Sequence, residues 1–237
     1  MKKLLTAIIP LFVLLACNKG NSHEVGEGFT AHLTLSRQWF TSFPNGVIRE
    51  EKYETAIANF QKENFNYDGG TVKYGDSVLT KHSLSFYYQS AGVDNILADF
   101  RAAYSGGKTW VVEGNSQYDV PACSTIAPNY PTFLYMKFDT LPVVHRNQSF
   151  MLSWDGSVPC DSISIGIFQG YRIVQTGVIS GRVSSMAFSP SQLAVLQRFE
   201  KAYIIIEGRN YNHTKTSGME VNAETYARRN CEVFVLD

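Results

Sequence analysis

The chain has 237 residues and a formal net charge of +0, with 21 basic and 21 acidic side chains. This balance excludes the strongly basic surface that attracts nucleic acid. Hydrophobic residues make up 44% of the chain and charged residues 18%, a composition that excludes general disorder and suits one large or two ordinary domains.

The chain begins with the pattern of a cleaved secretion signal. Lys2 and Lys3 precede an apolar run that ends at Leu14–Cys17 (Leu-Leu-Ala-Cys). The run is too short to cross a bilayer as a helix. Its end resembles the lipobox of bacterial lipoproteins. The resemblance implies that residues 1–16 are removed and that Cys17 carries acyl chains, two or more of which anchor a protein stably.

Residues 17–28 predict a flexible tether. They are polar and contain several glycines, with no apolar periodicity, which is typical of a linker. Loss of residues 1–16 removes two lysines and no acid, so the formal charge changes from +0 to −2. The mature chain is therefore not expected to favour an anionic partner.

Residues 29–125 predict a β-rich N-terminal domain. The sequence predicts strands at 29–35, 70–74, 83–89 and 109–114, separated by turns that contain glycine, aspartate and asparagine. Residues 50–63 are ambiguous, because their apolar positions fit either a helix or a strand. Residues 94–104 favour a helix with one apolar stripe. The proline-containing loop at 120–131 suggests a domain boundary.

Residues 132–237 predict a second β-rich domain. Ile163, Ile165 and Ile167 alternate with small or polar residues, a pattern that places one face of a strand on a core. Ser189 can cap a short helix that begins at Pro190. Period-two patterns indicate further strands at 149–154, 173–179, 184–188, 202–208 and 231–236.

This order of elements resembles immunoglobulin-like or fibronectin type III-like sandwiches, with Trp154 at the end of one strand and a Tyr-Ile-Ile-Ile strand after the helix. The resemblance implies a β-sandwich over 132–237. The predicted fold class is all-β, mainly strand with one or two short helices, in two sandwich-like domains after the signal and the tether.

Three cysteines remain once Cys17 is acylated, and an oxidising compartment allows any two of them to pair. Cys123 and Cys160 each follow a proline closely, which favours a disulfide between loops at these positions. The alternative is three buried free thiols, Cys231 included, that pack as small apolar residues.

The sequence predicts no catalytic residue, no metal ligand and no cofactor. Residues 75–78 resemble the opening block of the GDSL esterases, but no Asp precedes His145 or His213 at the spacing which that family requires, so a turn is expected there. The five histidines show no ligand-pair spacing. A hydrolase built from carboxylates far apart in sequence remains an open alternative.

The whole arrangement resembles uncharacterised lipoproteins of Bacteroidota, through the lipobox, the Trp-Val-Val-Glu-Gly stretch at 110–114 and the Leu-Ser-Trp-Asp-Gly stretch at 152–156. The resemblance implies a lipid-anchored protein of the outer membrane. Residues 18–22 lack the acidic run that serves as a surface-export signal in that group, which favours a position facing the periplasm over surface exposure.

The sequence therefore predicts a non-catalytic binding or scaffolding module of the cell envelope, with the membrane as one partner and an unknown protein or glycan as the other. A glycan-binding accessory lipoprotein is the alternative, suggested by tyrosines that could stack on sugar rings. It predicts exposed aromatic side chains close together on one face.

Overall fold

The structure, a computed structural model, describes residues 28–82, 86–91, 107–131, 141–154, 160–181 and 183–237. The secretion signal, most of the tether and the helix expected at 94–104 lie outside these residues. The all-β fold class is confirmed, since strands make up most of the described chain. None of the helices in the described ranges is long and apolar enough to cross a membrane.

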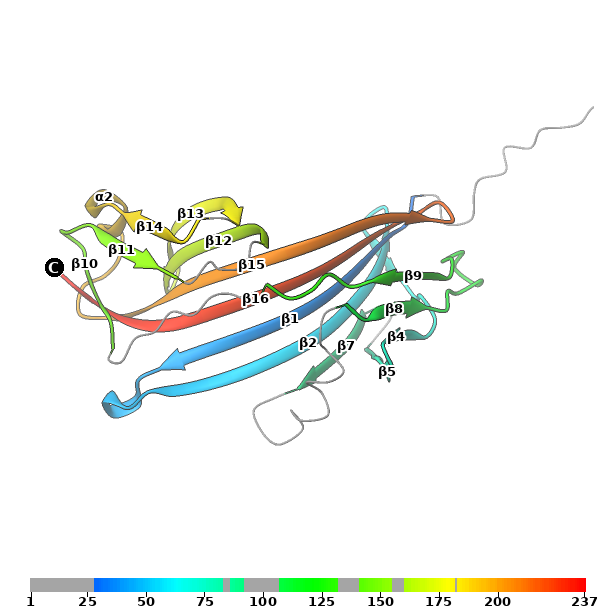
Figure 1. The fold of residues 1–237 in the computed structure, drawn as a ribbon, viewed down its shortest axis with the longest axis horizontal. Coiled ribbons are helices and arrows are strands. Elements are labelled where there is room, and N and C mark those ends of the chain that lie inside the picture. Colours follow the sequence, from blue (N-terminus) through cyan, green and yellow to red (C-terminus); the bar gives the residue numbers. More distant parts are fainter. Residues whose placement is uncertain (1–27, 83–85, 92–106, 132–140, 155–159, 182) are drawn as a thin grey trace, which may run out of the picture.

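Four long strands run the length of the molecule side by side (Figure 1). They are β1 (Thr30–Ser42), β2 (Arg49–Lys62), β15 (Lys201–Thr216) and β16 (Met219–Leu236). β15 and β16 form an antiparallel hairpin without a bulge along its register. β1 pairs in parallel with β16, and β2 pairs antiparallel with β1. The first and the last of the described strands are therefore neighbours in one sheet.

Shorter strands extend this large sheet at both sides, in the order β13-β12-β15-β16-β1-β2-β7-β6. β10 pairs with β16 beyond the end of β1, and β3 pairs with β2. The short turn η1 joins β1 to β2. These elements span β12 (Cys160–Gln169), β13 (Arg172–Gly181), β7 (Phe86–Ala91), β6 (Thr80–His82), β10 (Val143–His145), β3 (Phe65–Tyr67) and η1 (Pro44–Gly46).

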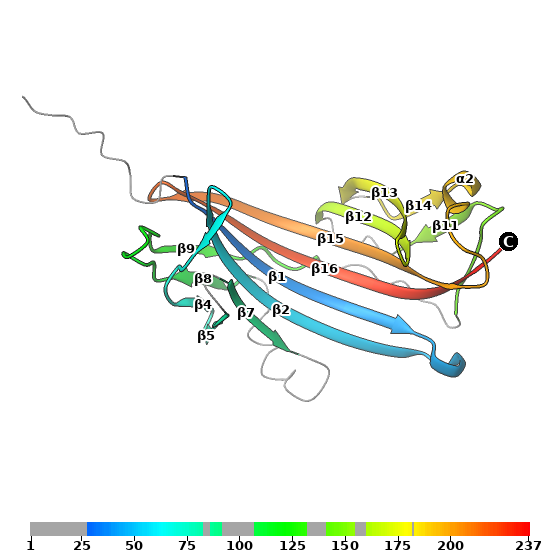
Figure 2. The ribbon, with the colours of Figure 1, turned by 180° about the vertical axis from the view of Figure 1, so that it is seen from behind.

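Two smaller layers pack on opposite ends of the large sheet (Figures 1 and 2). The first is a four-stranded sheet, and the second combines a two-stranded sheet with the short helix α2. Ser189 caps α2 in a capping box with Gln192, as the sequence predicts for its N-terminus. The elements are β5 (Ser77–Val78), β4 (Val72–Tyr74), β8 (Thr109–Val112), β9 (Cys123–Ile126), β11 (Phe150–Ser153), β14 (Ser185–Phe188) and α2 (Pro190–Leu193).

Both layers lie on the same face of the large sheet, which we call the covered face. Strand residues alternate between faces, and odd-numbered residues of β16 contribute to both cores: Val221 to the first and Val233 to the second. The first core contains Trp110, and the second contains Ile165. Complete burial of one such aliphatic side chain stabilises the fold by about 1.5–3 kcal/mol.

A charged cluster lies on the covered face between the two cores. Glu54 is fully buried and accepts ion pairs from Arg37 and Lys52, each at 2.8 Å. The Arg37 guanidinium also lies 4.4 Å from the centre of the Tyr130 ring. Buried charges need partners of this kind. The cluster is polar, and it lies between the two apolar cores.

Most predicted strands are confirmed, but four are longer or different from the prediction. The ambiguous segment 50–63 is the strand β2, with Ala56, Ala58 and Phe60 buried on one face. β1, β15 and β16 extend well beyond the predicted 29–35, 202–208 and 231–236. The added parts of these strands are mostly polar on the face opposite the two cores, so their apolar signal is weak.

The region around the predicted domain boundary also contains more structure than expected. β9 lies inside the predicted loop 120–131. Residues 29–125 and 132–237 share the large sheet, because β1 pairs with β16 over twelve register positions from Thr30↔Glu220 to Thr41↔Cys231. The division at 125 and 132 stays a prediction, while the pairing shows that the two segments are joined by strands.

The predicted disulfide between Cys123 and Cys160 is absent, since all three described cysteines are free and buried. Cys123 belongs to the first core and Cys160 to the second. Cys231 is opposite Ile204, which is opposite Ile167. Cys160 precedes Ile167 by seven residues, about 23 Å along a strand. Cys160 and Cys231 are therefore too far apart to form a disulfide, although both belong to the second core. The structure thus shows the alternative, three buried free thiols.

The three buried thiols should resist alkylation in the folded protein. Burial raises the pKa of Cys123 to about 11 and that of Cys231 to about 12, and it also raises the pKa of Cys160. At pH 8 few of these thiols are ionised, and the thiolate is the reactive form. We expect intact mass spectrometry after iodoacetamide treatment to show no adduct at these positions without denaturant and three adducts in guanidinium chloride.

Intact mass spectrometry of the untreated protein tests whether the three thiols are free. The mass before and after reduction should be identical. A loss of two hydrogens from the unreduced protein would contradict the structure.

Candidate functional site

The face opposite the two layers, which we call the open face, is where exposed side chains gather. It consists of the even-numbered residues of β1, β16 and β12 and the odd-numbered residues of β2 and β15. Among the described elements, both smaller layers pack on the other face. Large apolar side chains, among them Phe40 and Tyr203, are 37% and 45% exposed here.

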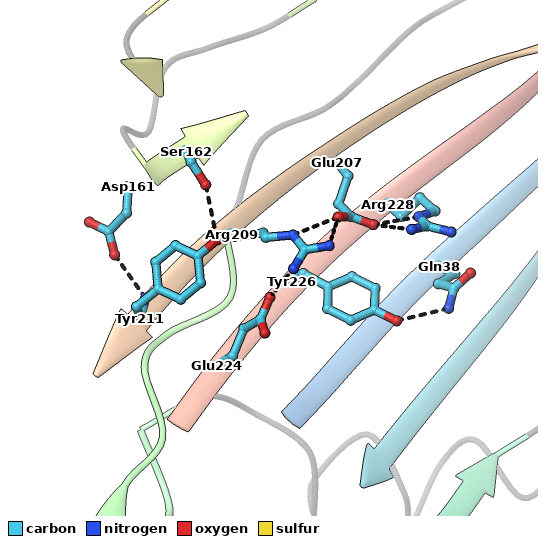
Figure 3. A network of polar contacts seen from close by, with 9 residues as sticks. All are labelled: Gln38, Asp161, Ser162, Glu207, Arg209, Tyr211, Glu224, Tyr226 and Arg228. Atoms are coloured by element: carbon cyan, nitrogen blue, oxygen red, sulfur yellow. Dashed lines mark hydrogen bonds and ion pairs between the residues drawn. The ribbon is translucent and has the colours of Figure 1, made fainter. Parts of the chain in front are cut away.

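A network of charged side chains crosses the middle of the open face (Figure 3). Glu207 on β15 is only 3% exposed, because two arginines cover it. Arg209 Nε donates to Glu207 Oε1 at 2.6 Å, and Arg228 Nε donates to Glu207 Oε2 at 2.5 Å. Arg209 also donates to Glu224 Oε1 at 2.7 Å. Two carboxylates therefore neutralise two guanidinium groups.

Burial and pairing act in opposite directions on the charges of this network. Burial disfavours the charge on Arg209, but the carboxylates of Glu207 and Glu224 outweigh it and raise the pKa of the guanidinium. Burial raises the pKa of Glu224, and the charge on Glu207 adds to the increase, while Arg209 opposes both. Arg209 is therefore held firmly in its charged form.

Two tyrosines fix the network to neighbouring strands. The Tyr226 ring lies 5.4 Å from the Arg209 guanidinium and 5.8 Å from that of Arg228, and both are cation–π distances. Gln38 on β1 donates to the Tyr226 hydroxyl at 3.3 Å. The Tyr211 hydroxyl lies 3.2 Å from the Ser162 hydroxyl. The open face is thus held in one arrangement from β12 to β1.

A hollow of about 450 Å³ lies beside this network, and we call it the aromatic hollow. Three of its lining side chains are aromatic: Phe40, Tyr53 and Tyr203. The Phe40 and Tyr53 rings pack edge to face, with centres 5.4 Å apart. The other lining side chains can form hydrogen bonds: Gln38, Thr41, Ser42, Glu51, Thr55 and Asn230.

Glu51 organises the side of the aromatic hollow formed by β2. Its Oε2 accepts a hydrogen bond from the Tyr53 hydroxyl at 2.9 Å. Its Oε1 pairs with Arg49 at 2.6 Å. The hydrogen bond to Glu51 is the main reason that the pKa of Tyr53 is raised. The Tyr53 hydroxyl therefore stays protonated and directed at the carboxylate.

A second hollow of about 310 Å³, the arginine hollow, lies on the same face. It is lined by Ser164, Gly166, Phe168, Ile205, Glu207, Arg209 and Arg228. Tyr203 lines the aromatic hollow, and Ile205 follows it on the same face of β15. Arg228 is opposite Gln38 in the register. The two hollows therefore adjoin across β15 and β16.

The residues predicted from the sequence fall elsewhere. Cys17 lies outside the described residues, and Cys123 and Cys160 are buried in separate cores. In the described ranges no group of three or more His, Cys, Asp or Glu is placed to hold a metal ion. Of residues 75–78, Gly75 and Asp76 form a turn between β4 and β5, with Gly75 at φ +55°, and Ser77–Val78 are β5 itself.

Sequence reasoning did not identify the aromatic hollow, because its residues come from four strands with large separations along the chain. The available signal was the alternation in 201–211, where Tyr203, Glu207 and Tyr211 lie on one face of a strand. Recognising it requires the pairing partners of that strand.

Comparison of the chain with protein-family models, with curated proteins and with solved structures gives no match.

Replacing Glu207 by Gln should destabilise the protein, because two guanidinium groups then share a neutral amide in place of a carboxylate. We expect the free energy of unfolding to fall by about 1–3 kcal/mol in urea titrations. Glu113→Gln is the matched control, since Glu113 pairs with Lys73 at 2.9 Å with half of its side chain exposed. The control should leave the midpoint unchanged. Equal midpoints for both variants would contradict a stabilising role of the network.

Proposed function

We propose that this chain is a lipid-anchored protein of the bacterial cell envelope, and that its folded part is a non-catalytic binding module that acts through the open face. The observation that carries the proposal is the aromatic hollow, with partly exposed Phe40 and Tyr203, beside a fixed charged network. Exposed apolar side chains that gather at a concave site are typical of binding surfaces.

The state of the carboxylates favours binding over hydrolysis. Glu207 and Glu224 both accept hydrogen bonds from Arg209. A general acid or base must reach the substrate with a free carboxylate oxygen, whereas both oxygens of Glu207 accept hydrogen bonds from arginines. Glu51 is likewise paired with Arg49. These carboxylates are suited to holding side chains in place.

The position of the anchor fits this role. The lipobox pattern at Leu14–Cys17 leads through the tether to β1, which begins at Thr30 beside the β15–β16 turn. Phe40 lies ten residues further along β1, about 33 Å from that end. The long strands would therefore hold the open face away from the membrane, and we place this membrane as the outer one, with the protein facing the periplasm.

We also propose that residues 132–237 form a sandwich of the immunoglobulin-like or fibronectin type III-like kind. It is supported by β12, β13 and β15, against which β11 and β14 pack through the second core. Such sandwiches commonly serve as binding modules in extracytoplasmic proteins.

Removal of the acylated cysteine tests the anchor. In Cys17→Ser we expect loss of metabolic acyl label and a protein that fractionates as soluble or as uncleaved precursor. Immunoblots of membrane and soluble fractions, with Cys123→Ser as control, report the outcome. An acylated, membrane-bound Cys17→Ser protein would contradict the proposed anchor.

Photo-crosslinking tests the binding face. A benzoylphenylalanine placed at Tyr211, on the open face, should give a discrete adduct in cells. The same group at Val195, which is exposed near α2 on the other face, is the control. Adducts from Val195 alone, or from neither position, would contradict the use of the open face.

A further inference from the structure

We propose that the aromatic hollow binds an uncharged saccharide, with a pyranose ring against Tyr203 and its hydroxyl groups bonded to the amides and hydroxyls around it. This proposal rests on the proposed function, because it names the ligand class of the same open face. The lining of the hollow, its charge and its position within the sheet support this ligand class.

The position of the hollow restricts how a ligand can be recognised. β1 and β16 are interior strands of the sheet, each paired on both sides along the hollow. Their backbone groups are used by the sheet, so a peptide cannot add there as a strand. Recognition must come from side chains alone, through hydroxyls, amides, a carboxylate and aromatic rings.

The side chains that line the aromatic hollow can both accept hydrogen bonds from sugar hydroxyls and stack on a sugar ring. Gln38 and Asn230 use their amide nitrogens to bond Tyr226 and the Trp39 carbonyl, which leaves the amide oxygens as acceptors for ligand hydroxyls. Tyr203 contributes an aromatic ring that is 45% exposed. An aromatic ring face attracts the partly positive C–H groups on the apolar side of a pyranose.

The polar part of the lining argues against an acyl chain. Every lining residue except Phe40 has a hydrogen-bonding group, because Tyr53 and Tyr203 add hydroxyls to the polar side chains of Gln38, Thr41, Ser42, Glu51, Thr55 and Asn230. Covering such groups with hydrocarbon would leave them without water or another partner, which costs free energy at each group. A ligand with many hydroxyl groups avoids that cost.

The charge of the hollow argues for a neutral ligand. Its carboxylate, Glu51, is neutralised by Arg49. In the adjoining arginine hollow, Arg209 and Arg228 both pair with Glu207, and Arg209 also pairs with Glu224, which lies outside the lining. Both guanidinium groups of the arginine hollow are thus already paired with carboxylates, which disfavours binding of an acidic sugar there.

The size of the face allows more than one sugar unit. The aromatic hollow measures about 450 Å³, within the range of about 300–1,000 Å³ for small-ligand sites. The arginine hollow adds about 310 Å³ on the same face, toward β12. A linear oligosaccharide would therefore cross the strands from Tyr53 toward Phe168.

Native affinity electrophoresis of the acylated full chain in mild detergent tests the proposal. The gels contain starch, mixed-linkage β-glucan, galactomannan or xylan as neutral probes, and polygalacturonate as the acidic probe. We expect retardation by at least one neutral probe. Tyr203→Ala and Phe40→Ala should weaken it about tenfold or more, as expected for the loss of one ring contact.

Tyr171→Ala is the control, because Tyr171 is fully exposed at the turn between β12 and β13, away from the lining. It should bind like the unmodified chain. Circular dichroism should show that all three variants keep the fold, since the replaced rings are partly or fully exposed.

Three outcomes would overturn the saccharide proposal: no retardation by any neutral probe, retardation by polygalacturonate alone, or retardation unchanged by Tyr203→Ala. Cross-linking from Tyr211 separates this failure from failure of the proposed function. An adduct from Tyr211 together with no polysaccharide binding would keep the open face as a protein-binding surface. Loss of both would reject the binding face itself.

Discussion

The parallel pairing of β1 with β16 is the constraint on which the rest of the structure depends. It joins the first described strand to the last one over most of the length of β1. β2 then extends the sheet on one side, while β15 and β12 extend it on the other. The strands of the first smaller layer come from the chain between β2 and β12, while β14 and α2 of the second layer come between β13 and β15.

The two faces of the sheet differ because their side chains differ. Along β16, Val221, Ala223, Val233 and Val235 alternate with polar or charged residues on the open face, such as Glu224 and Arg228. The apolar series therefore selects one face for both layers, and the shift of a single residue in register would expose all of it. On β1 and β2, the buried cluster around Glu54 lies between the residues of the first core and those of the second.

The sequence allowed the all-β class and most strand positions to be predicted, because alternation at residues such as Ile163, Ile165 and Ile167 is a local signal. It could not predict the lengths of β15 and β16, whose distal halves are polar on one face. Nor could it predict the aromatic hollow, since Phe40, Tyr53, Tyr203 and Asn230 come together only through long-range pairing. The disulfide prediction was wrong for the same reason: loop prolines do not reveal that Cys123 and Cys160 lie in separate cores.

An open sheet face supported by two cores offers a rigid surface for recognition, because its side chains project from strands that are already paired. Hydroxyl-radical footprinting of the purified full chain tests this arrangement most directly. The account predicts rapid oxidation of Phe40, Tyr203 and Tyr211 and protection of Trp110, Phe60 and Phe188, which are buried. Protection of Phe40 and Tyr203 to the same extent as Trp110 would contradict it, because the face that we describe as open would then be covered.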